Sequence, residues 1–172
     1  SVLAFMMTAC IYTQDPVPEN VRTAKFSKGA DISWITQMEK EGVMFYNSSG
    51  KEVECTSLLK EFGFDAIRLR IWVKPTGKWC DKADLITKAK RAQKLGMDIM
   101  IDFHMSDTWA DPGSQTTPAA WTGYSESEMM LAIQAHVKDI LQSLKDNAID
   151  IKWVQVGNEV NQGMLWPTGQ VN

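Results

Sequence analysis

The sequence predicts an α/β fold of the (β/α)8 TIM barrel type, of which these 172 residues supply roughly the first four strand–helix units. Short apolar runs alternate strictly with helical patterns, which is typical of parallel βαβ units. Polar side chains also gather where the apolar runs end, and those ends converge on one mouth in a barrel. An average barrel takes about 250 residues. The chain is therefore expected to hold about half of one.

Four runs have the length and the β-branched content of strands. The first, residues 26–31, is weak, and the others cover residues 65–73, 97–104 and 151–157. Trp153, within the last run, is expected to lie in the core. The alternation alone does not separate a barrel from a doubly wound open sheet. No glycine-rich phosphate loop follows any of the runs, which argues against nucleotide binding.

Helical patterns fill the segments between the strands. Residues 54–62 and 84–95 have apolar side chains at helical spacing, and each pattern ends at a glycine. A longer helix is expected to begin at Ser125, because Glu128 three residues on completes a capping box. Its apolar stripe runs from Met129 to Leu144.

Composition limits the possible partners. The net charge of −3 and the pI near 5.4 argue against a nucleic-acid partner. The chain holds seven tryptophans, whose flat apolar faces suit either a core or the C–H face of a sugar ring.

Glu159 is the candidate for acid–base chemistry. It follows an apolar strand, where partial burial favours the protonated form of a carboxyl group, as glycoside hydrolysis requires. Asn158 can hydrogen-bond a sugar hydroxyl beside the anomeric carbon, and Arg70 can orient a facing carboxylate. The alternatives are that Glu159 caps the next helix or pairs with Arg70, and that Arg70 pairs with Asp102.

Other polar and aromatic residues follow the strands. His104 and Asp107 are candidates for binding substrate hydroxyls. A zinc site needs more histidine, and the chain has only two, so no metal is expected. Trp109 and Trp166 fall in loops after strands, where a sugar cleft would need them.

Six segments resemble glycoside hydrolase family 53: KGADIS at 28–33, RLRIW at 68–72, IDFHMSD at 101–107, WADPG at 109–113, AAW at 119–121 and VQVGNEVNQGMLWP at 154–167. That family consists of retaining arabinogalactan endo-β-1,4-galactanases, which cut the β-1,4-galactan of pectin. Departures from the family pattern are Met105, where an aromatic residue is frequent, and Cys80, where cysteine is unusual.

The resemblance implies that Glu159 is the general acid/base. It implies that Arg70, His104, Asp107 and Asn158 are active-site neighbours and that Trp109 lines the cleft. Asp31, at the end of the first run, and Trp166, in the loop after the fourth, complete the expected galactan-binding set by their position. The nucleophile would be a second Glu at the end of a seventh strand, beyond Asn172. No cofactor is implied, and the full-length enzyme is expected to be a monomer. The alternatives are another retaining barrel hydrolase, of the mannanase or cellulase type, and a non-catalytic half-barrel that binds glycans at the surface.

The N-terminus is interpreted as an export signal. Residues 1–10 resemble the tail of a lipoprotein signal peptide, in which Cys10 would carry the lipid, and residues 11–25 form a linker to the hydrolase domain at 26–172. This predicts a cell-surface or periplasmic lipoprotein with a membrane anchor, or otherwise a secreted protein. Cys55 and Cys80 are expected either to pair or to stay free thiols.

Overall fold

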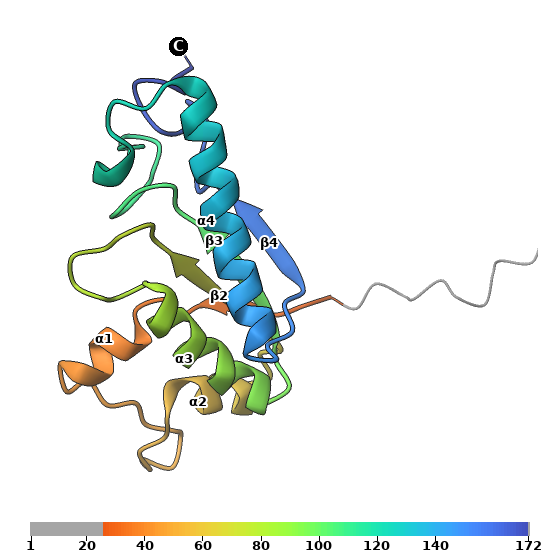
Figure 1. Ribbon diagram of the computed structural model, residues 1–172. Coiled ribbons are helices and arrows are strands. Elements are labelled where there is room, and N and C mark those ends of the chain that lie inside the picture. The colour runs from red at the N-terminus through yellow and green to blue at the C-terminus, as the bar shows by residue number, and fades with distance from the viewer. Residues whose placement is uncertain (1–25, 172) are drawn as a thin grey trace, which may run out of the picture.

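The computed structural model describes residues 26–171, in which four parallel strands form one sheet (Figure 1). The strands are β1 (Gly29–Asp31), β2 (Ala66–Ile71), β3 (Asp98–Phe103) and β4 (Trp153–Val156), and they lie in chain order. Each neighbouring pair is parallel. This is the arrangement that consecutive units of a barrel require, and all four predicted strands are present.

The sheet separates polar from apolar side chains by face. Alternate residues of a strand point to opposite faces, and the register aligns Asp31 with Arg68 and Arg70 with Asp102. The opposite face carries fully buried aliphatic and aromatic side chains of β2 and β3: Ile67, Leu69, Ile71, Ile99, Ile101 and Phe103. The polar face is therefore the one that can form a site.

In the described part of the chain, five helical segments accompany the strands: α1 (Ile35–Lys40), α2 (Cys55–Glu61), α3 (Lys82–Lys94), the short 3-10 helix η1 (Ala119–Trp121) and α4 (Glu126–Asp146). The three predicted helices are α2, α3 and α4, and the capping box of Ser125 and Glu128 is present. The pattern did not reveal α1, because its single buried residue, Ile35, produces no stripe.

The core lies between the apolar face of the sheet and the helices, of which α3 packs against β2 and β3. Leu85, Ala89 and Ala92 of α3 are fully buried there, and α4 adds Ile140 and Leu144. Figure 1 shows α3 and α4 in front of the strands. These helices cover the apolar face of the sheet, so the polar face lies on the side opposite the core.

The last strand is an edge with exposed apolar side chains. Val154 and Val156 are 39% and 48% exposed. The expectation that Trp153 lies in the core is wrong, because 37% of this residue is exposed. Trp153 pairs in register with Met100 on the polar face of the sheet, where both residues line an open cavity together with Arg68.

The expectations for the N-terminus, namely the signal-peptide tail, the lipid-bearing Cys10 and the linker, lie outside the described residues. No helix within residues 26–171 is long and apolar enough to cross a membrane. Cys55 and Cys80 are both free thiols, so the structure selects the second of the two expectations for this pair.

Candidate functional site

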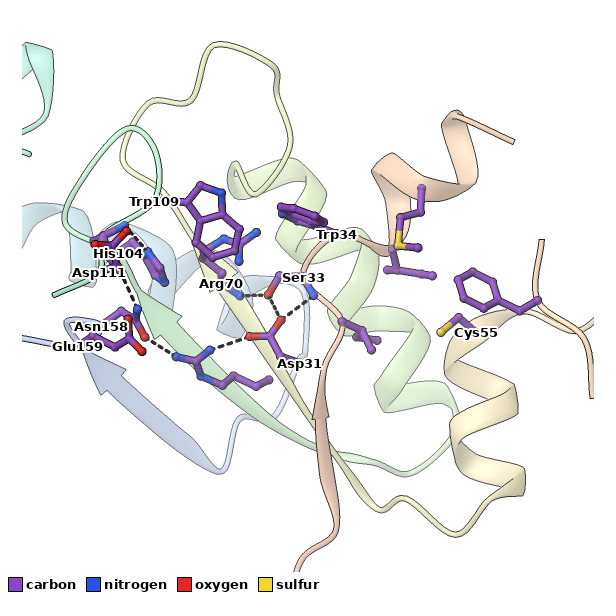
Figure 2. Close-up of a pocket in the computed structure, with 16 residues that line it drawn as sticks. Asp31, Ser33, Trp34, Cys55, Arg70, His104, Trp109, Asp111, Asn158 and Glu159 are labelled. Carbon is purple, nitrogen blue, oxygen red and sulfur yellow. Dashed lines mark hydrogen bonds and ion pairs between the residues drawn. The ribbon is translucent and has the colours of Figure 1, made fainter. Parts of the chain in front are cut away.

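A cavity of about 530 Å³ opens at the carboxyl ends of the strands. Six of the predicted site residues line it: Asp31, Arg70, His104, Trp109, Asn158 and Glu159. Five other polar or aromatic residues of the lining were not among the predicted site residues: Ser33, Trp34, Phe45, Arg68 and Asp111. Figure 2 shows labelled side chains of this set reaching the cavity from β1, from β2 and from the segments that follow β1, β3 and β4.

Arg68 is the central cation of the cavity. One guanidinium nitrogen lies 2.7 Å from Oδ2 of Asp31, and another lies 2.6 Å from Oδ2 of Asp102. The second nitrogen also donates to Oδ1 of Asn158 over 2.7 Å. Arg68 thereby joins β1, β3 and the loop after β4 by charge-assisted hydrogen bonds, which are stronger than neutral ones. Asp102 therefore pairs with Arg68, and not with Arg70 as the alternative interpretation held.

Asp31 is held as a carboxylate. Burial alone would raise the pKa of Asp31, but hydrogen bonds from Ser33 and the ion pair with Arg68 outweigh it and lower the pKa below the usual value. The backbone N–H and the hydroxyl of Ser33 donate to Oδ1 over 2.9 and 2.6 Å. Both carboxylate oxygens are thus engaged by the protein, so Asp31 orients Arg68.

His104 is buried with both ring nitrogens engaged. The backbone N–H of Ala110 donates to Nδ1 over 3.0 Å, so Nδ1 carries no hydrogen. The ring proton is therefore assigned to Nε2, which lies 2.9 Å from Oδ2 of Asp102. The ring also contacts Trp109 edge to face. His104 consequently orients Asp102.

Arg70 is 3% exposed, and its guanidinium lies among three indole rings. Its central carbon lies 3.8 Å from the centroid of Trp109, 4.8 Å from Trp72 and 5.9 Å from Trp34. Within residues 26–171 Arg70 forms no ion pair with a carboxylate. Cation–π attraction to the indoles, worth about 0.5–2 kcal/mol per ring, stabilises the charge of Arg70 in place of a carboxylate. It also orders the aromatic wall of the cavity (Figure 2).

Asn158 and Glu159 form a tight turn just after β4. The side-chain nitrogen of Asn158 donates to the carbonyl of Ala110 over 2.7 Å, which leaves its second hydrogen for a ligand. Glu159 is exposed at the rim and has φ of 49°, in the left-handed region that residues with a Cβ seldom adopt. The partial burial expected for this carboxyl is not found within the described residues.

Two predicted site residues lie outside the cavity. The carboxylate of Asp107 accepts hydrogen bonds from the backbone N–H groups of Lys74 and Ala119, over 2.9 Å each. Trp166 donates its indole N–H to the carbonyl of Gln162 over 3.0 Å. Both residues fix loops in this structure.

The residues that sequence reasoning missed have identifiable signals. Arg68 lies two residues before Arg70, so a strand presents both on the same face. Ser33 and Trp34 follow β1, which has only three residues, so its pattern did not show where the strand ends and the loop begins. No group of three or more His, Cys, Asp or Glu that could hold a metal occurs within residues 26–171.

Comparison with known proteins places this geometry in a family. The family model described as "Glycosyl hydrolase family 53" matches residues 27–172. An arabinogalactan endo-β-1,4-galactanase A of Aspergillus niger is 37% identical over 145 residues, which are 84% of this chain and 41% of the relative. The chain thus spans about two-fifths of the length of the relatives it matches.

Two solved structures are similar in fold. One, described as belonging to two fungal β-1,4-galactanases, has a TM-score of 0.82 and 36% identity, and the match covers 85% of this chain and 44% of that one. The other is the GH53 catalytic domain of Ignisphaera aggregans, with a TM-score of 0.81, 34% identity and coverage of 91% and 45%. These neighbours confirm the predicted fold, a partial (β/α)8 barrel. A parallel sheet with a cavity at its carboxyl ends, together with a family match over residues 27–172, shows that the chain belongs to glycosyl hydrolase family 53.

Proposed function

We propose that this chain is the acid/base-bearing part of an endo-β-1,4-galactanase, which hydrolyses β-1,4-galactosidic bonds of (arabino)galactan with retention of configuration. The position of Glu159 supports the proposal most: it follows β4 at the rim of the cavity, next to Asn158. The relatives named as galactanases supply the substrate class.

In the proposed mechanism Glu159 first gives its proton to the glycosidic oxygen, while a second carboxylate attacks the anomeric carbon. Glu159 then takes a proton from the water that releases the sugar. Retention needs the two carboxyl groups about 5–5.5 Å apart. The carboxylates of Asp31 and Asp102 are engaged by Arg68. We therefore assign the nucleophile to the part of the family's domain that lies outside these residues.

The test is Glu159→Gln in this chain extended to the length of its relatives, with the exposed Glu61→Gln on α2 as the control. General acid–base groups contribute about 10²- to 10⁴-fold, and a loss of that size in kcat on galactan is expected. The kcat/KM for an aryl galactoside whose leaving group needs no proton should fall much less, because it reports only the first step, in which Glu159 acts as the acid. Unchanged kcat in the variant would contradict the role of Glu159. Turnover of mannan or cellulose in place of galactan would contradict the substrate, and retention on galactan without turnover would favour a binding protein.

We further propose export with a lipid anchor on Cys10, supported by the apolar run that ends in Met-Thr-Ala-Cys. Cells that express the complete gene would be labelled with a fatty-acid analogue. Label that persists in Cys10→Ser would contradict this anchor.

A further inference from the structure

We infer that Gln115 is a positioning residue for Glu159; the activity readout of this inference rests on the galactanase proposal above. Gln115 lies in the loop between β3 and α4, more than forty residues before Glu159 in the chain. It is 3% exposed and is not part of the cavity lining. Its side chain therefore acts from behind the site, without touching a substrate.

The amide nitrogen of Gln115 faces three backbone carbonyls. It donates to the carbonyl of Asn158 over 2.8 Å, and it lies 3.2 Å from that of Asp111 and 3.4 Å from that of Glu159. Carbonyl oxygens only accept hydrogen bonds, so the group among them must be the NH₂ and not the amide oxygen. No other uncharged side chain of this length supplies two hydrogens at one atom.

The turn that receives these hydrogen bonds is one that needs support. Glu159 has φ of 49° and Gly157 has φ of 100°, so two of three consecutive residues lie at positive φ. The ladder of β4 ends at Val156, so it does not hold the peptide groups of Asn158 and Glu159. Rotation of these peptide groups would swing the carboxyl of Glu159 along the rim.

Neighbouring contacts keep Gln115 itself in place. The backbone carbonyl of Gln115 accepts the backbone N–H of Trp166 over 2.8 Å. The hydroxyl of Thr117 donates to the backbone carbonyl of Trp166 over 2.8 Å. The loop that carries Gln115 is therefore fastened to the segment beyond Glu159. The Gln115 amide joins that loop to the peptide of the acid itself.

A displaced acid affects turnover more than binding. A misplacement of about 1 Å at a reacting group costs on the order of 100-fold in rate. The ion pairs of Arg68 with Asp31 and Asp102 and the stacking of Trp109 on Arg70 do not involve the Gln115 amide. Loss of the amide donor should therefore lower kcat and leave KM nearly unchanged.

The experiment compares Gln115→Glu and Gln115→Ala with the exposed control Gln142→Glu, in the chain extended to the length of its relatives. At neutral pH the carboxylate of Gln115→Glu cannot donate, and kcat should fall on the order of 10- to 100-fold. As the pH falls toward the carboxyl range, near about 4.3 for glutamate, protonation restores an O–H donor. The ratio of the variant's kcat to the wild-type kcat, measured at the same pH, should then rise in Gln115→Glu and in no other variant.

A purely structural Gln115 gives a different result. Both variants would then match wild type in kcat, or would lose kcat by a ratio that does not change with pH, and either outcome overturns the inference. Gln115→Glu decides the question even where Gln115→Ala fails to fold. If the wild-type domain does not cleave galactan, the proposed function fails and crystal structures decide this inference. A positive φ at Glu159 retained in Gln115→Glu would then overturn it, and a changed φ would support it.

Discussion

Lys88 is fully buried, and its ammonium group links the core to the site. It lies 2.7 Å from Oδ2 of Asp84 and donates to the carbonyl of Ser33 over 2.6 Å. The hydroxyl of the same serine donates to Asp31 and accepts the backbone N–H of Arg70. A charge on α3 thus fixes the loop that orients the carboxylate partner of the central arginine.

Replacing Lys88 by methionine should be strongly destabilising. It leaves the carboxylate of Asp84 buried without its cation, which costs about 3–5 kcal/mol of unfolding free energy. The matched control is Lys82→Met, whose exposed pair with Asp139 is worth less than about 1 kcal/mol. Urea unfolding of both variants measures the difference, and equal destabilisation would contradict this account.

The lowered pKa of the half-buried His136 should make the folded protein less stable at mildly acidic pH. Burial lowers the pKa of His136 below the usual value of 6.5; the charge of Asp139 raises it by a smaller amount, and the charge of Lys82 lowers it further. The unfolded chain therefore takes up a proton near pH 6.5 while the folded chain does not. Stability is complete above that pH and falls as the pH drops toward the lower folded value.

The check is the Tm of wild type and of His136→Leu between about pH 5 and pH 8, the range in which histidine charge changes. His136 contacts Phe103 and Trp121 edge to face, so an apolar replacement keeps a similar environment. The decline on the acidic side should be smaller in the variant. An identical slope in both proteins would assign the pH dependence to other groups.

Residue types at strand ends predicted six of the sixteen residues that line the cavity, but they did not predict which of these side chains pair with one another. Arg70 was assigned a carboxylate partner, whereas Arg68 holds both Asp31 and Asp102. Period-two alternation places both arginines on one face, and only the spatial position of the indoles decides which one stacks and which one pairs. Those positions depend on three separate loops, which no local pattern encodes.

At the scale of elements, the turn after β4 depends on Gly157. At φ of 100° a Cβ here would meet Cγ1 of Val160 at 2.8 Å. Gly157→Ala should therefore cost about 1–3 kcal/mol of stability and should lower kcat, because the strain is released in the peptides of Asn158 and Glu159.

Gly96→Ala is the matched control for this prediction. Gly96 also has positive φ, of 63°, but a Cβ there meets no atom within 4 Å. Urea unfolding and kcat on galactan separate the two effects: the control should lose some stability and keep its kcat. Equal kcat in both variants would contradict the importance of the turn.

The elements with long sequence patterns were predicted better than the short ones. The capping box at Ser125 and the long stripe of α4 marked that helix from the sequence. By contrast, α1 has six residues and one buried side chain, too few for a period to emerge. Strand β1, with three residues, was the weakest expectation for the same reason.

At the scale of the whole molecule, apolar surface lies at the β4 edge. Val156 and the α4 residues Ile133, Val137 and Leu141 line an open groove of about 580 Å³. Parallel sheet edges with such surface associate readily. Residues 26–172 expressed alone should therefore self-associate. Under the proposed mechanism they should also fail to cleave galactan, because the nucleophile is assigned outside these residues.

Size-exclusion chromatography with light scattering measures the association, and reducing-end release from galactan measures activity. Val156→Lys, which places a charge in the groove, should shift the distribution toward monomer. A monomeric wild-type segment, or one that cleaves galactan, would contradict this prediction.

The indoles around Arg70 have an optical consequence. Trp34 and Trp109 are 48% and 43% exposed at the cavity, whereas Trp121 is 7% exposed in the core. A sugar that covers the first two displaces water from their rings and shifts their emission to shorter wavelength, while the emission of Trp121 stays constant. Under the proposed function the protein therefore contains its own fluorescent reporter of occupancy, with which oligosaccharide binding would be titrated without a label and without turnover.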